Sequence, residues 1–301
     1  MHLQLLIADD TPFSPPGPES DLPVRVYGPQ SEILNPSKLL WDTLHDISAG
    51  RELAWRLFTR DIKAQYRQTY FGYLWAFIPP LVGAITFIFL QSQGITNIEG
   101  TLIPYPVFVM IGTMLWQTFA DATMSPLQSI NGARSMLVKL NFPREAILMA
   151  GMYIVTFNML VRLILLAVVM VVWRVSPGMT LLAFPVSVFG LLACGFGIGM
   201  LILPIGSLYG DIARGFPILL QFGMFLTPVV YPARTEGFAG WLATWNPLAP
   251  LIETGRSALT GQPIASLQHL VAVLMASLLV CFVSVAIFRL TIPHLIERMG
   301  G

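Results

Sequence analysis

Charged residues are scarce in this chain. Only 11% of its 301 residues are Asp, Glu, Lys or Arg, whereas 55% are hydrophobic and the mean hydropathy is +0.69. Soluble chains carry about a quarter charged residues, so this composition excludes an ordinary soluble domain. Several apolar runs are long enough to cross a bilayer as helices, and none shows the alternating polarity of barrel strands. The composition therefore predicts an all-α polytopic membrane protein.

The residues that common catalytic motifs require are also missing. The lysines are Lys38, Lys63 and Lys139, and none follows a glycine, so the chain lacks a phosphate-binding loop of its own. No Ser-His-Asp set, His-Glu-x-x-His motif or metal-ligand spacing of histidines is present. Cys194 and Cys281 lie far apart inside apolar runs and imply no disulfide framework. We therefore expect a non-enzymatic chain with no metal or cofactor, in which any ATP-driven activity needs a separate subunit.

The polar N-terminal region divides into two parts. Residues 1–34, proline-rich at 9–20 and without a signal-peptide pattern, are expected to form a retained, partly disordered tail. Residues 35–70 predict amphipathic interface helices. Their apolar stripe contains Leu53, Ala54, Leu57, Phe58 and Ile62, and their cations include Arg51, Arg56, Arg60 and Lys63. Such a helix either lies in the lipid headgroup layer or packs on a soluble partner.

Residues 71–301 predict a permease domain with six transmembrane helices. The expected spans are residues 73–90, 104–125, 146–173, 180–203, 216–231 and 267–290. Residues 232–263 are half apolar but broken by Pro and Gly, and they predict re-entrant helices before the last span. Gly195 and Gly199, four residues apart in the fourth span, indicate close helix packing rather than a nucleotide fingerprint.

The distribution of Lys and Arg predicts the orientation. Of the 17 cations, 13 fall on the side that holds both termini, the loop between the second and third spans, and Arg214. Because cytoplasmic loops are enriched in Lys and Arg, both termini are expected in the cytoplasm.

Few charges lie within the expected spans. Asp121 is placed near the cytoplasmic end of the second span and Arg162 near the middle of the third, so their depths differ by several turns and we do not pair them. Arg162 is open to three roles: snorkelling, pairing with a carbonyl, or meeting an anionic substrate in a central cavity. Glu253 and Arg256 form a local ion pair or anchor the re-entrant segment.

Aromatic side chains are the remaining candidates for a conduit. Most of them fit interfacial belts or packing, while a minority could stack on sugar rings. The candidate channel and gate residues are Trp75, Trp116, Arg162, Tyr231, Trp241, Trp245, Glu253 and Arg256.

The stretch "LVKLNFPREAIL" (residues 137–148) places three charges and a proline between two apolar runs. A short helix that starts near Asn141 or Phe142, with Pro143 in its first turn, would be preorganised as a rigid protrusion. The alternative interpretation is that these charges only keep the loop on the cytoplasmic side of the membrane.

Four stretches together resemble a known family. They are "RDIKAQYRQTYFGYLWAFIPPL" (60–81), "NGARSMLVKLNFPREAIL" (131–148), "GDIARGFPILLQFGMFLTPVVYP" (210–232) and "NPLAPLIETGRSALTG" (246–261). In this order they resemble the type-2 ABC transporter permeases, and most closely the bacterial polysaccharide exporters of O-antigen, capsule and teichoic acid. The resemblance covers the chain from about residue 35 to its end.

The resemblance implies a homodimer in the bacterial inner membrane, bound to two ATP-binding cassette subunits that carry ATP and Mg. It implies an undecaprenyl-linked polysaccharide as substrate, residues 35–70 as an interface helix, residues 131–145 as a coupling loop and residues 232–263 as gate helices. A short loop at 209–215 resembles a second cytoplasmic contact. The implied ATPase-coupling residues are Asn131, Lys139, Phe142, Pro143, Arg144, Glu145, Asp211 and Arg214.

Two other functions stay open. A membrane-embedded glycolipid transferase would need acidic or histidine residues clustered at one membrane face, and carboxylates are sparse here. An exporter of a drug or small lipid would share the same broad family.

Overall fold

The chain folds as an all-helical protein, as predicted. The computed structural model describes residues 36–67, 69–94, 103–139, 144–232, 237–264 and 266–300, and this part of the chain contains no strand. The helices are α1 (Pro36–Tyr66), α2 (Ile78–Ser92), α3 (Tyr105–Gly132), α4 (Arg134–Lys139), α5 (Glu145–Val172), α6 (Ala183–Leu208), α7 (Gly210–Leu226), α8 (Gly237–Trp245), α9 (Ala249–Thr260) and α10 (Leu267–Gly300), with 3-10 helices at Gly72–Ala76 and Met179–Leu182. The expected N-terminal tail, residues 1–34, lies outside the described residues.

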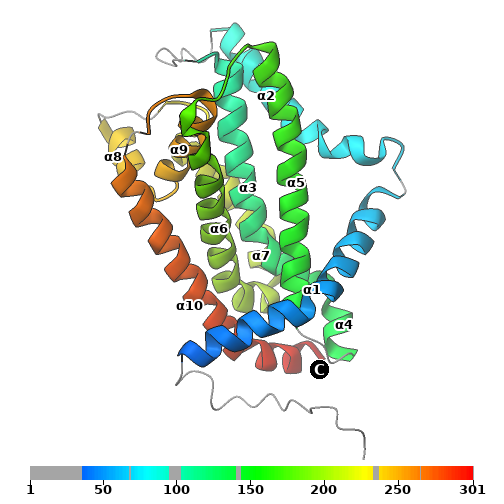
Figure 1. Ribbon diagram of the computed structural model, residues 1–301. Helices are drawn as coiled ribbons and strands as arrows, with labels where there is room; N and C mark the ends of the chain where they lie inside the picture. The colour runs from blue at the N-terminus through cyan, green and yellow to red at the C-terminus, as the bar shows by residue number, and fades with distance from the viewer. Residues whose placement is uncertain are drawn as a thin grey trace, which may run out of the picture.

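The long helices form a bundle with two distinct ends. Helices α3, α5 and α6 run side by side, and α10 packs against α6 (Figure 1). Helix α1 lies across one end of this bundle, where α4 and the C-terminal part of α10 also lie. Helices α8 and α9 lie near the other end (Figure 1). The expected interface helix (35–70) and the expected re-entrant segment (232–263) are assigned to opposite sides of a membrane. Their helices, α1 on the one hand and α8 and α9 on the other, lie at opposite ends of the bundle.

Among the described residues, three helical stretches are long and apolar enough to cross a membrane: Glu145–Val172, Met179–Leu208 and Leu267–Thr291. The other three expected spans do not meet both criteria, and the helix of the expected span 216–231 ends at Leu226, where α7 gives way to a turn. Helix α3 is as long as α5 but carries Gln117, Asp121 and Gln128, and the apolar stretch Ile78–Leu90 of α2 is short. The described part of the chain thus contains three candidate spans, and its other helices are too polar or too short to meet the expectation.

The prediction of a short loop at residues 209–215 is wrong, because most of this segment is helical. Helix α7 begins at Gly210, so Asp211 and Arg214 lie on the first turns of a helix and are exposed. Tyr209 is extended (φ −114°, ψ 107°) and is the sole residue between α6 and α7. Asp211 in the first turn favours a helix start here, because a carboxylate stabilises the positive end of the helix dipole.

The interface between α3 and α6 depends on glycine, as the sequence predicts. A Cβ added to Gly195 would lie 2.6 Å from the Phe119 carbonyl oxygen, and one added to Gly199 would overlap the Thr123 carbonyl oxygen. The two helix backbones therefore approach too closely for a larger residue. Small residues at i and i+4 allow this approach between membrane helices.

The amphipathic pattern of α1 is visible in its packing. Ala54, Leu57 and Ile62 are buried, whereas the four cations of the expected interface helix are exposed. Helix α1 packs against α5, where Phe58 meets the rings of Tyr153 and Phe157 edge-on. The apolar face of α1 is thus covered by the bundle.

Replacement of Gly199 by Ala should lower stability. The new methyl group has to push α3 and α6 apart, and overpacking of this kind costs about 1–3 kcal/mol. The measurement is the midpoint of thermal unfolding in detergent. Gly83 of α2 is the matched control: a Cβ added there meets nothing within 4 Å, so Gly83→Ala should leave the midpoint unchanged or raise it. Equal midpoints for the two variants would contradict the close α3–α6 approach.

Candidate functional site

A cavity of about 620 Å³ lies between α1, α3, α5 and α7. Its wall combines apolar residues with several hydrogen-bonding side chains. The amide and hydroxyl side chains that line it are Gln117, Ser125, Gln128, Ser129, Asn158 and Gln221. These side chains offer hydrogen-bond donors and acceptors without a net charge, so the cavity suits a neutral, hydroxyl-rich ligand or water.

Asp121 and Arg162 form an ion pair at this cavity, which corrects the expectation that they lie at different depths. The Arg162 guanidinium Nη2 donates to Asp121 Oδ2 at 2.6 Å, and Asp121 lines the cavity. The sequence placed the end of the second span at Ser125, but α3 continues to Gly132. At 1.5 Å per residue this moves the helix end by about 10 Å, so Asp121 lies deeper in the bundle than expected.

Two polar atoms near the cavity lack a partner within the described part of the chain. They are the Ser125 hydroxyl oxygen and Nη1 of Arg162. Gly151 of α5 leaves the space that the hydroxyls of Ser125 and Ser129 occupy, because an added Cβ would collide with both. Buried polar groups normally find partners, so these two atoms mark a place that favours water or a polar ligand.

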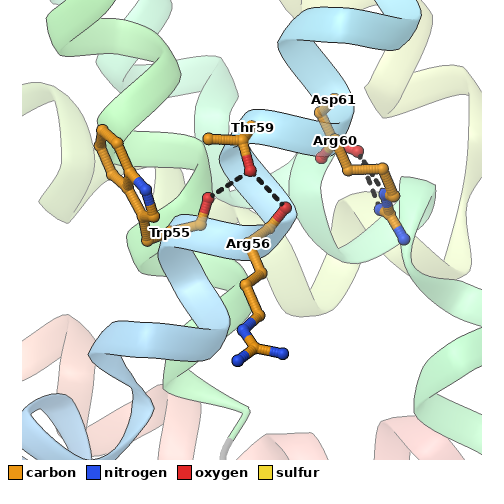
Figure 2. A network of polar contacts seen from close by, with 5 residues as sticks. All are labelled: Trp55, Arg56, Thr59, Arg60 and Asp61. Carbon is orange, nitrogen blue, oxygen red and sulfur yellow. Dashed lines mark hydrogen bonds and ion pairs between the residues drawn. The ribbon is translucent and has the colours of Figure 1, made fainter.

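Helix α1 contributes Arg60 and Asp61 to the cavity wall. They pair with each other, Arg60 Nη2 lying 2.8 Å from Asp61 Oδ1 (Figure 2). Immediately before Arg60, the Thr59 hydroxyl lies 3.0 Å from the carbonyl oxygens of both Trp55 and Arg56 (Figure 2). Thr59 therefore satisfies its hydroxyl locally, and the charges of α1 near the cavity are held within the helix.

Of the candidate channel aromatics, Trp116 lines the cavity and is buried. Its ring packs against Phe119 at 5.3 Å between centroids and faces Gly223 of α7, where an added Cβ would lie 3.1 Å from the indole. Trp75, Trp241 and Trp245 are exposed and do not line it. The Tyr231 hydroxyl donates to the Phe225 carbonyl at 2.9 Å.

Arg256 of α9 is buried and held mainly by backbone oxygens. Its Nη2 donates to the Val229 carbonyl at 2.7 Å and to the Pro228 carbonyl at 3.2 Å, and the guanidinium lies 3.7 Å from the centroid of the Phe108 ring. Within the described residues no ion pair joins it to Glu253. Of the two alternatives for Arg256, the geometry favours an anchor, which ties α9 to the turn after α7 and to α3.

The segment 232–263 contains two short helices in its described part, α8 and α9. Helix α9 packs against α6, α3 and α10, and the Ser187 hydroxyl donates to the Leu251 carbonyl at 2.6 Å. Asn246 joins this segment to α7, because its side-chain amide donates to the Thr227 hydroxyl at 2.8 Å. At 12 residues α9 is too short to cross a bilayer, which needs about 20.

The coupling residues suggested by the sequence lie mostly at the end of the bundle that α1 covers. Asn131 is exposed near the end of α3, and Lys139 is the last residue of α4. Phe142 and Pro143 lie outside the described residues. Arg144 precedes α5, whose first residue is Glu145.

Glu145 is engaged within the chain by a residue that the sequence did not single out. Nη2 of Arg289, on α10, donates to Glu145 Oε1 at 3.0 Å and to Asp46 Oδ2 of α1 at 2.9 Å. In the sequence, Arg289 served only as one of the cations that predict orientation, and Asp46 was given no role. Separations of 144 and 243 residues leave no local signal for these pairs.

Comparison with known proteins places these features in a family. The model of the ABC-2 type transporter family matches residues 52–260, more than half of the chain. The chain belongs to the ABC-2 type transporter family. The matched region includes the cavity, the Asp121–Arg162 pair and the Arg256 anchor.

Three relatives share similar low identity with the chain over most of their length. An O-antigen export system permease protein of Klebsiella pneumoniae is 24% identical over 234 residues, which cover 76% of this chain and 88% of the relative. One from Myxococcus xanthus is 24% identical over 246 residues (79% and 92%). A polysialic acid transport protein of Escherichia coli is 22% identical over 249 residues (77% and 91%).

A double-mutant cycle tests the Asp121–Arg162 pair. Asp121→Asn and Arg162→Gln should each lower the free energy of unfolding by about 2 kcal/mol, because each leaves its partner's charge partly buried with a weaker hydrogen bond. The double variant should lose clearly less than the sum of the single losses, as is usual for residues in direct contact. The exposed Glu52–Arg56 pair of α1 is the control, and it should show little coupling. Additive losses at Asp121 and Arg162 would contradict the contact.

Proposed function

We propose that this chain is the permease subunit of an exporter that moves a lipid-linked polysaccharide from the cytoplasm across the bacterial inner membrane to the periplasm. Two copies of the chain would form a homodimer, and two ATP-binding subunits, which carry ATP and Mg, would power it. The relatives named for O-antigen export and polysialic acid transport support this substrate class. The absence of a phosphate loop from the sequence supports a separate source of energy.

The observation that carries the proposal is the set of amide and hydroxyl side chains that border a cavity among apolar helices. Amides and hydroxyls on α3, α5 and α7 match the donors and acceptors of a sugar chain, and the buried indole of Trp116 offers a flat apolar face. Asp121 and Arg162 add a strong dipole with little net charge. This lining would let a hydroxyl-rich chain pass without binding it tightly.

The two ends of the bundle fit the two sides of the proposed exporter. The cation-rich end, with α1, α4 and the start of α5, would face the cytoplasm and the ATP-binding subunits, with both termini on that side. The end with α8 and α9 would face the periplasm, where re-entrant helices anchored by Arg256 would form the gate.

The two alternatives differ in what they need. A glycolipid transferase needs a catalytic group, and the polar residues of the cavity include no His and only the paired carboxylates of Asp61 and Asp121. An exporter of a drug or small lipid would need few hydrogen-bonding groups in its cavity, whereas six amide and hydroxyl side chains border this one beside its apolar residues.

Deletion of the gene should block export while synthesis continues. We expect undecaprenyl-linked glycan to accumulate on the cytoplasmic face and to disappear from the cell surface, as measured by antibody labelling of intact and permeabilised cells. The purified chain alone should hydrolyse no ATP. Together with its ATP-binding partner in membrane vesicles, it should export the glycan when ATP is supplied. Glycan synthesis by the chain alone would support the transferase instead, and unchanged surface glycan with lost drug resistance would support the drug exporter.

Replacement of Gln221 by Leu should reduce export and leave folding intact. The variant removes one donor and one acceptor from the cavity wall while nearly keeping side-chain size, so we expect a loss of about tenfold or less in export rate, in proportion to one hydrogen bond of about 1 kcal/mol. Phe222→Leu on the exposed face of the same helix is the control. Export by Gln221→Leu at the rate of this control would exclude the cavity as the pathway.

A further inference from the structure

Three helices that are far apart in the sequence meet at the first residue of α5. Asp46 comes from α1, Glu145 begins α5, and Arg289 lies near the end of the apolar stretch of α10. Both carboxylates accept from the same nitrogen, Nη2 of Arg289, at 2.9 and 3.0 Å. One guanidinium nitrogen thus joins α1, α5 and α10 at a single point, which we call the three-helix charge cluster.

This charge cluster is largely shielded from water. The side chains of Asp46 and Arg289 are 6% and 9% exposed, and that of Glu145 is 19% exposed. Phe288, next to Arg289, and Ala146, next to Glu145, are both buried. Gly50, one turn after Asp46, approaches Ala146 so closely that an added Cβ would lie 3.2 Å from the alanine Cβ. Apolar packing therefore lies directly beside the charges, both where α1 meets α5 and on α10.

Burial of these charges is an inefficient way to gain stability. Taking ions out of water costs several kcal/mol for each ion, and an apolar replacement of a buried ion pair is often as stable. Buried charges do fix geometry, because a bond of defined length and direction is lost when the helices shift by a few ångströms. The charge cluster is therefore better suited to hold the three helices in one arrangement than to stabilise the fold.

The three-helix charge cluster lies where the expected coupling loop meets a candidate membrane span. Glu145 is the last residue of the expected coupling loop, 131–145, and the first residue of a candidate membrane span. Helix α4, inside the same loop, packs against α10. A displacement of the loop would reach α5 directly through the backbone, but it would reach α1 and the last span only through packing and the charge cluster.

We propose that Arg289 is a positioning residue that makes α1, the start of α5 and the end of α10 move as one unit when the ATP-binding partner displaces the coupling loop. This inference rests on the proposed function, because it presumes a partner that delivers mechanical work. It adds Asp46 and Arg289 to the residues that matter for coupling, and it gives Glu145 a role within the chain rather than in direct contact with the partner.

The first experiment separates ATP hydrolysis from export in the assembled complex. Arg289→Gln should lower the amount of polysaccharide exported per ATP by about tenfold, a typical size for a coupling between two sites. ATP turnover should stay close to that of the wild type, since the partner itself is unchanged. Arg289→Lys should restore most of the export, because a single nitrogen makes both contacts and an ammonium group can replace it.

The matched control is Arg174→Gln. It removes one exposed cation at the far end of α5, and it should leave both ATP turnover and export at wild-type levels. A residue with only a structural role would lower the yield of complex and both activities together. An unchanged ratio of export to ATP hydrolysis in Arg289→Gln would overturn the proposal.

A second experiment does not depend on the folding of the Arg289 variants. Cysteines at positions 50 and 146 (Gly50→Cys with Ala146→Cys) would place two Cβ atoms 3.2 Å apart. A small outward shift would bring them to the spacing in a disulfide, about 3.8 Å. If α1 and α5 move as one unit, oxidation should cross-link them and leave export of the otherwise wild-type chain unchanged. Export that stops on oxidation and returns on reduction would show that the two helices move against each other, which overturns the proposal.

The wild-type chain distinguishes this inference from the proposed function. If the wild type shows no export dependent on an ATP-binding partner, the proposed function fails and the inference fails with it. If the wild type exports and couples normally while Arg289→Gln does the same, only the inference fails.

Discussion

Charged side chains that leave water must find partners inside the chain, and in this protein that requirement determines how the helices meet. An unpaired buried ion costs several kcal/mol, far more than a typical packing contact contributes. Arg162 meets Asp121, Arg289 meets Asp46 and Glu145, and Arg256 meets two carbonyl oxygens and the Phe108 ring. Each of these cations joins elements that the chain connects only distantly.

These three cations, all largely shielded from water, lie at different levels of the bundle. Arg289 lies at the end that α1 covers, and Arg256 lies with α9 toward the other end (Figure 1). Arg162 lies on α5 between them and borders the polar cavity through Asp121. Between these levels the helices contact one another through apolar side chains and glycines, which limit distance but not register. The charges therefore define the register at the two ends of the bundle and beside the cavity.

The sequence predicted features that depend on local periodicity. The amphipathic face of α1 follows from the spacing of Ala54, Leu57 and Ile62, and the α3–α6 approach follows from Gly195 and Gly199. It failed where a helix continues beyond its apolar run. Helix α3 extends through Gln128 to Gly132, and because hydropathy alone ended it at Ser125, the depth of Asp121 was misjudged and its pair with Arg162 was missed.

Tertiary partners were invisible for a different reason. The carbonyls that hold Arg256 belong to Pro228 and Val229, and a backbone acceptor carries no sequence signature. The same holds for the side-chain partners of Arg289. The positive-inside rule already explains a cation at the end of a span, so nothing in the sequence was a reason to look for a carboxylate beside it. A buried guanidinium nevertheless needs acceptors, and within a chain of 16 acidic residues few carboxylates can supply them. The scarcity of charge that first marked this chain as a membrane protein thus also makes each buried pair hard to replace, because a cation that loses its carboxylate has few others within reach.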